Sequence, residues 1–475
     1  MTRLTRQNEL VALHVALPNE ILAEILIAGK PSERSDITRY LLNISAVCTL
    51  WRNIALPLPS LWTTITLAHS TRGTGVDYLE AMLSRSKDVA LDMLLDFERV
   101  WHWKVDYARH IKRIVAPHLH RCWSLQLQFT TIHESEAFLP LDPSLMNHLL
   151  CFRCHVVDTD GGGPRGLLLF KPPTSPHSLP NLRELRLKGH VSLSGFAATP
   201  KKRIDVFEYC GLCGIYEWAY VRRDMPDIMY YIAECCSLTT LVLSVDHGSV
   251  FGDQAPVLEL PLLTTLKVID RQASIFHRYI SAPRLESLTI SPNTSGPDFQ
   301  SSMMSYKLPF LKTFRSCNHS PTDLTTILEA SQSIQKLEIF QCFPPQAIVL
   351  ALLGLQEYDT VTSPPGYPTA EANLWSDATS NYPQTAFYDE TSVARDDGAE
   401  QHTLLPALKT LRMVFYGSRP RSDAAWKERI TTLLNNRPTL KLVVERLTFA
   451  PSRRRSRHLC FVNVTCTCVM SDATP

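Results

Sequence analysis

A short apolar phrase returns along the chain and restricts its fold more than any other feature. The phrase is Leu-x-x-Leu-x-Leu or a close variant, and the alternation at its end is typical of a short β-strand. Successive copies start 56, 25, 22, 26, 23 and 74 residues apart, so most are one unit apart and the long gaps fit several units or an insertion. The clear copies begin at Leu182, Leu238, Leu263, Leu285, Leu311, Ile334 and Leu408.

A period of about 20–29 residues with this phrase is the signature of leucine-rich repeats. Helix-like stretches at 225–233, 274–280 and 323–331 lie between copies, so each unit reads as strand, loop and helix. Such units stack into a curved solenoid with parallel strands and with helices on the convex side. We therefore predict an α/β fold. An ordinary α/β domain with Leu-rich strands stays as the alternative.

The repeats are expected to be irregular and to begin early. Fainter copies start at Trp62, Val89 and Trp123, and the Asn or Cys that usually follows the strand occurs only at Asn293 and Cys342. A proline stands two residues before several copies, where it ends the preceding helix without removing a ladder hydrogen bond. These prolines are Pro180, Pro261, Pro283, Pro309 and Pro406.

The first sixty residues follow a helical pattern instead. The apolar residues of 17–26 recur at helical spacing, with Pro18 in the first turn and Gly29 as a stop. A second helix is predicted from the apolar residues between Ile37 and Trp51, with Ser35 or Asp36 as its cap and the prolines at 57 and 59 as its end. Two helices of this length bury little area, so they need a third element or a partner.

These residues resemble an F-box, especially the form common in large fungal F-box families. The resemblance covers about 45 residues and rests on three ordered groups. They are Leu17-Pro18-x-Glu20-Ile21-Leu22, then Val47-Cys48-x-x-Trp51-Arg52-x-Ile54-Ala55, then Pro59-x-Leu61-Trp62. The linker between the helices, 30–39, is longer than in the shortest F-boxes.

The resemblance implies a non-catalytic substrate-recognition adaptor of an SCF-type (cullin-RING) ubiquitin ligase. The F-box would bind a Skp-type adaptor on the cullin scaffold, and the repeats would hold an unknown protein target for ubiquitin-dependent degradation. The first alternative is a leucine-rich-repeat scaffold acting outside ubiquitination, and the second is an unrecognised hydrolase. The residues expected to contact the adaptor are Leu17, Pro18, Ile21, Leu22, Ile25, Val47, Trp51 and Ile54.

Two segments near the C-terminus differ strongly in charge. Residues 356–404 carry nine acidic residues and one arginine, which predicts a flexible acidic insertion. Residues 419–458 carry eleven Lys or Arg and three acids. The run 453–457 is either a solvated surface, a nuclear-import signal, or a contact with an acidic partner or a nucleic acid.

The expected domains are an N-terminal tail at 1–15, an F-box at 16–62, a repeat solenoid at 63–355, the acidic insertion at 356–404, and the last repeats with a basic segment at 405–475.

Catalytic and metal motifs are not evident, so we expect no cofactor. Cys151-x-x-Cys154 and Cys210-x-x-Cys213 would be a zinc site only if they were closer, because 56 residues separate the pairs and such sites usually span about 12 to 20. The triple glycine 161–163 lacks the lysine of a phosphate loop, and histidines 102, 110, 118 and 120 fit no metal spacing. Most cysteines read as core residues.

Composition points to an intracellular protein. The net charge is +2 over 475 residues, so we do not expect nucleic acid as a partner, and no apolar run approaches the roughly 20 residues of a membrane span. The N-terminus lacks the apolar run of a secretory signal. We therefore expect a cytoplasmic or nuclear protein, or one found in both, with no membrane contact.

Overall fold

The computed structural model describes most of the N-terminal third and the strands that follow it. The described residues are 17–67, 74–97, 104–156, 167–168, 179–189, 191–192, 196, 201–210, 228–244, 258–269, 280–291, 308–317, 328, 331–341, 405–416, 430–435, 437–447 and 468–469. The acidic insertion at 356–404 and the basic run at 453–457 lie outside these residues.

The N-terminal part is helical. Helix α2 (Asn19–Ala28) starts after Pro18 and ends at Gly29, as the sequence predicts. The predicted second helix is in fact two, α3 (Arg34–Val47) and α4 (Thr49–Ala55), followed by a 3-10 turn η1 (Pro59–Trp62).

The break between α3 and α4 lies at Cys48. Its backbone is extended, with φ −158° and ψ 171°, and its Sγ accepts a hydrogen bond from the Trp51 N–H at 3.5 Å. The first turn of α3 follows Glu33 without a side-chain cap, so the prediction of a Ser35 or Asp36 cap was wrong.

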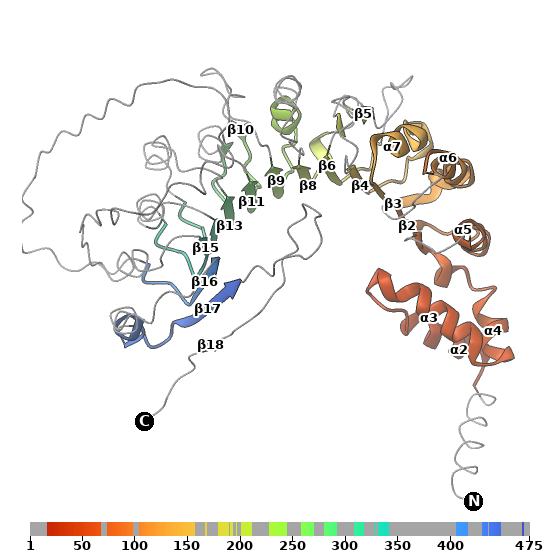
Figure 1. Cartoon of the computed structure of the whole chain (residues 1–475), viewed down its shortest axis with the longest axis horizontal. Coiled ribbons are helices and arrows are strands. Elements are labelled where there is room, and N and C mark those ends of the chain that lie inside the picture. The colour runs from red at the N-terminus through yellow and green to blue at the C-terminus, as the bar shows by residue number, and fades with distance from the viewer. Residues whose placement is uncertain are drawn as a thin grey trace, which may run out of the picture.

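From residue 64 onward the described strands build one long curved sheet. Figure 1 shows the strands lining the inner side of an arch, with the N-terminal helices at one end and β17 at the other. The described sheet has 14 strands, and all neighbours pair in parallel except β17 and β18. In sheet order they are β1 (Thr64–Leu67), β2 (Leu91–Asp96), β3 (Cys122–Phe129), β4 (Cys151–Val156), β6 (Glu184–Gly189), β8 (Val206–Cys210), β9 (Thr240–Ser244), β11 (Thr265–Ile269), β13 (Ser287–Ser291), β14 (Thr313–Cys317), β15 (Lys336–Gln341), β16 (Thr410–Tyr416), β17 (Lys441–Leu447) and β18 (Cys468–Val469).

Helices cover the outer side of the arch. Helices α5 (Thr74–Arg85), α6 (Lys104–Val115) and α7 (Ile132–Phe138) lie there in Figure 1. Two short parallel pairs, β5 (Leu167–Leu168) with β7 (Val191–Ser192) and β10 (Leu258–Glu259) with β12 (Ile280–Ser281), form separate two-stranded sheets. The remaining 3-10 turns are η2 (Ala116–Arg121), η3 (Pro143–Leu145) and η5 (Lys201–Arg203). Parallel strands with convex helices confirm the predicted α/β solenoid class.

The predicted helices between repeats are described only in part. Residues 228–233 are helical, within the predicted 225–233. Of 274–280 only Ile280 is described, and it lies in β12, so the helix prediction was wrong there. Of 323–331 only Leu328, which is helical, and Ser331, which is not, are described.

A tight turn introduces each strand of the repeats. The first leucine of the phrase donates its N–H three residues back, as in Leu182 to Leu179 O (3.2 Å) and Leu408 to Leu405 O (3.1 Å). The prolines before the phrase therefore occupy the second position of a four-residue turn, which their fixed φ favours. Their role is thus turn formation directly before the strand.

The core lies between the sheet and the outer helices. Along the repeat strands, side chains alternate between the core and the concave face. Those that face the core are mostly apolar, and Leu185, Leu241 and Phe314 among them are fully buried. Near β2 and β3 an aromatic cluster fills this layer, with Phe97 and Phe129 stacked at 5.0 Å between ring centroids. The buried side chains from Leu26 to Leu442 form one contiguous cluster, so the N-terminal helices share the core of the repeats.

Candidate interaction surfaces

Helix α2 carries apolar side chains that the described chain covers only in part. Ile21 is 47% exposed and Ile25 is 48% exposed, and these residues lie one helical turn apart. Pro18, one residue before the helix, is exposed as well. Val47 at the end of α3 is 57% exposed. Two exposed isoleucines on one stripe are costly in water, so this stripe has the character of a docking face.

The other residues assigned to this face are less available. Leu22 is 2% exposed and is buried within the helices, so it cannot reach a partner in this conformation. Trp51 and Ile54 are half-buried and pack against the shared core. Leu17 is half-buried. Leu42 on α3, which is not among the predicted contact residues, is 64% exposed.

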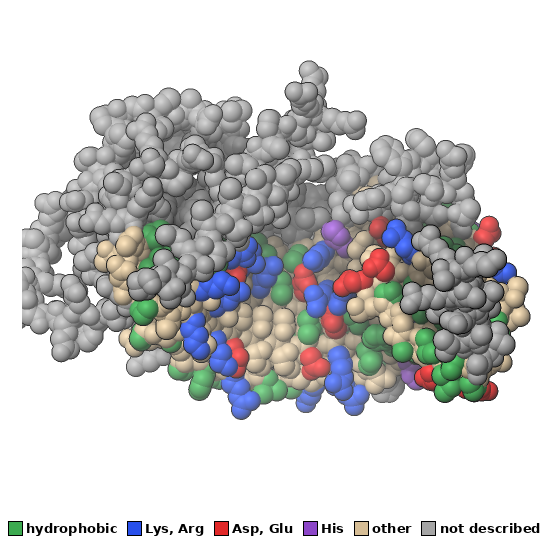
Figure 2. All heavy atoms as spheres, turned by 90° about the horizontal axis from the view of Figure 1, so that it is seen from below, with side chains coloured by type: hydrophobic (Ala, Val, Ile, Leu, Met, Phe, Trp, Pro, Cys, Tyr) green, Lys and Arg blue, Asp and Glu red, His purple; other side chains and the backbone are tan. Residues whose placement is uncertain are grey.

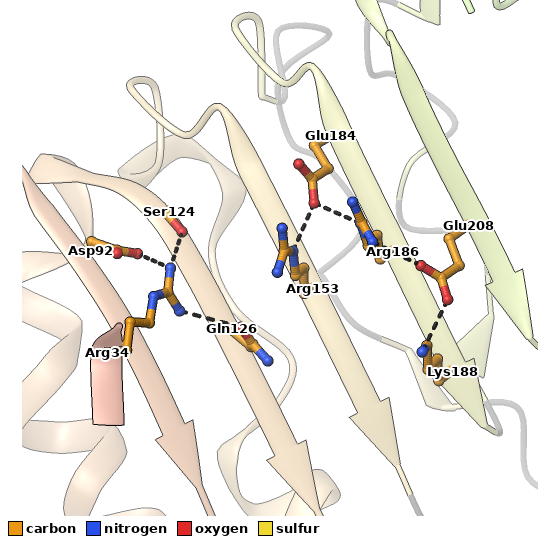
Figure 3. A network of polar contacts seen from close by, with 9 residues as sticks. All are labelled: Arg34, Asp92, Ser124, Gln126, Arg153, Glu184, Arg186, Lys188 and Glu208. Atoms are coloured by element: carbon orange, nitrogen blue, oxygen red, sulfur yellow. Dashed lines mark hydrogen bonds and ion pairs between the residues drawn. The ribbon is translucent and has the colours of Figure 1, made fainter. Parts of the chain in front are cut away.

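Polar contacts tie the helices to the first strands of the sheet (Figure 3). Arg34 of α3 donates to Asp92 of β2 at 2.5 Å, to Ser124 at 3.3 Å and to Gln126 of β3 at 3.2 Å. Asp92 and Ser124 are partners in the β2–β3 register. One guanidinium therefore bridges three side chains from two strands, which fixes the orientation of α3 on the sheet.

A second contact repeats this coupling at the edge strand. The Nζ of Lys30, between α2 and α3, donates to Thr63 Oγ1 at 3.2 Å and to Thr64 Oγ1 of β1 at 3.1 Å. Burial lowers the pKa of Lys30, and nearby Asp92 partly opposes this effect. Thr38 of α3 bonds the Tyr78 hydroxyl of α5 at 3.0 Å. With the shared core, these contacts make the helices and the first repeats one unit.

The inner, concave face of the sheet carries a ladder of charges between β4 and β8. Glu184 accepts from Arg153 and pairs with Arg186, both at 2.7 Å, and Glu208 pairs with Arg186 at 3.2 Å and with Lys188 at 3.0 Å (Figure 3). Burial would raise the pKa of Glu184, but its hydrogen bond from Arg153 and the two guanidinium charges lower it overall. Opposite charges alternate across the strands, so this ladder largely neutralises itself.

The cysteine pairs do not form a zinc site in the described residues. Cys154 faces the core of β4 and is buried, which raises its thiol pKa far above the usual range. Cys151 and Cys210 lie on the concave face, and burial raises the pKa of each to about 11. Cys213 and the glycines 161–163 lie outside the described part. No group of three potential metal ligands occurs among the described residues.

The histidines around residue 110 also stay separate from any site. His118 bonds Arg121 at 3.2 Å, and burial lowers the pKa of its ring first, with the Arg121 charge adding to this. His120 bonds the carbonyl of Pro117 at 2.8 Å. His110 lies on α6 and is exposed, and His102 is outside the described residues.

None of the described helices has the length and apolar character that a membrane span requires.

Comparison with family models identifies the helical part. The F-box-like model matches residues 14–68, which include α2, α3, α4, η1 and β1. The chain carries an F-box-like domain. Its exposed stripe at Ile21 and Ile25 therefore belongs to the F-box-like domain, and Arg34 joins that domain to strands β2 and β3.

Comparison with known proteins adds little beyond this domain. No curated protein matches the chain. Among solved structures it is similar to the leucine-rich repeat-containing protein LegL7 from Legionella pneumophila, at 14% identity. The match covers 66% of this chain and 87% of that chain, with a TM-score of 0.28. At this TM-score the match adds nothing to the fold that the strand pairings define.

Proposed function

We propose that this chain is a substrate-recognition adaptor of an SCF-type ubiquitin ligase. The observation that carries the proposal is the F-box-like domain whose helix α2 exposes Ile21 and Ile25 while its Leu26 joins the repeat core. F-box domains typically bind Skp-type adaptors, and an exposed apolar stripe on a short helix suits a helix-packing partner. The contact set we propose is Leu17, Pro18, Ile21, Ile25 and Val47 at the surface, with Trp51 and Ile54 supporting it.

The repeats would supply the second half of the function. A concave sheet with outward polar and charged side chains offers a large surface for a protein target. The chain would hold that target near the ubiquitin-charged enzyme, so its contribution is proximity and no bond is made or broken by its own residues. Fixed attachment of α3 through Arg34 supports this role, because a rigid bridge keeps the target at a constant distance from the ligase.

The domain boundaries follow from the same proposal. We place a tail at 1–15, the F-box at 16–62 and the solenoid from 63, with the insertion at 356–404 and the last repeats after 405. A fungal-type F-box, a cullin scaffold as partner, and a cytoplasmic or nuclear location remain part of this proposal. F-box and repeat-scaffold families are typically non-enzymatic, which supports an adaptor without catalysis.

The alternative is an interaction scaffold that binds a Skp-type adaptor outside ubiquitination. Copurification separates the two proposals. The tagged full chain is co-expressed with a Skp-type adaptor and a cullin, and the purified complex is assayed for ubiquitin transfer. The adaptor function predicts a complex of all three proteins that transfers ubiquitin. A stable complex with the Skp-type protein that never contains a cullin would contradict it and favour the scaffold.

A further inference from the structure

The two halves of the concave face differ in charge. On the concave face from β2 to β8, the strands carry three basic side chains and four acidic ones. Arg34 extends onto this face from α3, so four positive charges meet four negative ones. The basic residues there are Arg153, Arg186 and Lys188, and the acidic ones are Asp92, Asp96, Glu184 and Glu208. This half is neutral overall.

The half from β11 to β16 is positively charged. Its described side chains on the concave face include four basic residues and one acidic residue, which leaves a net charge of +3. The basic residues are Lys267, Arg315, Lys336 and Arg412, and the acidic one is Glu338. Figure 2 looks into the arch from below and shows Lys and Arg side chains gathered over the C-terminal half of the face, with few acidic ones.

Two arginines in this half are held in place by an aromatic ring. Phe340 of β15 faces the concave side but is only 8% exposed, and Arg315 of β14 lies over its ring at 4.2 Å from the centroid. Arg412 of β16 lies 5.7 Å from the same centroid. The stacking restricts the guanidinium groups before any partner arrives, which lowers the entropy that binding must overcome.

Glu338 lies among these cations and neutralises only part of their charge. Its carboxylate is 2.7 Å from Lys336 Nζ, 3.8 Å from Arg412 and 3.9 Å from Arg315, and its side chain is largely buried. All three basic side chains stay substantially exposed, so they can reach a second anion from the solvent side. Guanidinium groups suit carboxylates in particular, because they can donate two parallel hydrogen bonds.

The same surface continues to Lys267 of β11. Lys267 forms no ion pair with a described residue. Its positive charge slightly opposes the rise in the pKa of the Cys210 thiol, which lies two strands away. Beside this basic row runs a row of half-exposed hydroxyls on neighbouring strands, Thr240, Thr265, Ser287 and Thr313. Hydroxyls can donate further hydrogen bonds to carboxylates or peptide carbonyls.

The dimensions fit a short extended segment. Four strand-to-strand steps separate β11 from β16, and at about 4.8 Å per step Lys267 and Arg412 lie roughly 19 Å apart along the sheet. An extended chain advances about 3.3 Å per residue, so about six residues cover this distance. The basic side chains lie on the concave side of the arch (Figure 2), which a flat membrane surface cannot enter.

We propose that the concave face from β11 to β16 binds an extended acidic segment of a partner protein. Aspartate or glutamate side chains of that segment contact Lys267 at one end and the Arg315–Arg412 pair at the other. The proposal deepens the proposed function, because it gives the chemical class of the target segment. It is tested without any ligase component, so its failure is distinct from failure of the adaptor role.

The test measures binding of labelled peptides to the full chain by fluorescence anisotropy. One peptide carries a run of about six glutamates and its control carries glutamines at the same positions. We expect the glutamate peptide to bind at least about tenfold more tightly at low salt and to lose affinity as salt screens the charges. Equal binding of the two peptides would overturn the proposal. Tighter binding of a single-stranded RNA, or of a phosphoserine peptide alone, would overturn the choice of carboxylates.

Two variants locate the site. Lys267→Glu reverses a charge that forms no ion pair with a described residue, and Arg412→Gln leaves Arg315 and Lys336 to pair with Glu338. Each variant is expected to bind the glutamate peptide about tenfold more weakly than the wild-type chain does. The matched controls are Arg113→Glu and Arg113→Gln on the exposed, convex side of α6, which make the same charge changes and should stay within about twofold.

A melting curve of every variant shows whether it is folded. Because Lys267→Glu disturbs neither the Phe340 stack nor the core, it keeps the test decisive even where Arg412→Gln is unstable. Unchanged binding by folded Lys267→Glu and Arg412→Gln would overturn the proposed site.

Discussion

Arg34 of helix α3 and Asp92 of strand β2 form an ion pair across the junction between the F-box-like domain and the repeats. The two residues are 58 positions apart in the chain, and the Asp92 side chain is only 12% exposed. A nearly buried carboxylate needs its partner, so the pair resists separation of the two parts. Together with the shared core around Leu61 and Ile65, it makes the junction rigid.

Removal of this pair should destabilise the junction. Arg34→Ala leaves Asp92 without its guanidinium, and we expect a loss of about 1–3 kcal/mol in the free energy of unfolding. Urea denaturation followed by tryptophan fluorescence measures it, since Trp51 and Trp62 lie in this part. Arg39→Ala on the exposed side of α3 is the matched control and should change little. Equal stability of both variants would show that the pair does not hold the junction.

Truncation of a core side chain in the repeats should strongly destabilise the fold. Phe314 of β14 is fully buried at the second position of the phrase, whereas Phe310, four residues earlier, is 57% exposed. We expect Phe314→Ala to cost about 3–5 kcal/mol through lost burial and a cavity, and Phe310→Ala to cost far less. Thermal unfolding of the two variants checks this directly. A similar loss from both would contradict the assigned register of β14.

The thiols should differ in reactivity according to burial. Cys48 and Cys236 are exposed, whereas Cys122 and Cys235 are buried, and burial raises the pKa of each of those two to about 12. Alkylation requires an accessible thiolate, so brief treatment of the native chain with iodoacetamide should modify the exposed pair first. Peptide mapping by mass spectrometry gives the order. Early labelling of Cys122 in folded protein would contradict its place in the core.

The sequence predicts strands where leucine fills the core positions, and it misses strands where other residues do. Strands β4 and β8 follow the same phrase with other residues at the positions that face the core. These are Phe152 and Cys154 in β4, and Phe207 and Tyr209 in β8. These side chains are buried like the leucines, because the core requires apolar volume and not one residue type. Their substitution concealed β8 within the long gap before Leu238 and β4 between Trp123 and Leu182, and it made Cys151 and Cys154 resemble a metal pair.

The surfaces were less predictable than the strands. Leu22 and Ile21 are neighbours in one apolar run, yet one is buried and the other exposed, since the packing of α3 and α4 decides which side of α2 is free. The bridge from Arg34 to Asp92 and Gln126 joins elements distant in the chain, so no local pattern indicates it. The same holds for the Arg315–Phe340–Arg412 stack, which exists only because β14, β15 and β16 pair in register.

The central claim is that the exposed stripe of α2 docks the chain on a Skp-type adaptor. The most direct measurement is the affinity of the full chain for a purified Skp-type adaptor, by calorimetry, for wild type and for Ile21→Asp/Ile25→Asp. Both isoleucines are about half exposed, so the double change should leave the melting temperature nearly constant. Tyr230→Asp, an exposed apolar position on the repeats, is the control. We predict tight binding by wild type and control, and a loss of at least about tenfold for the double variant. Unchanged affinity of the folded double variant, or no binding by the wild-type chain, would contradict the claim.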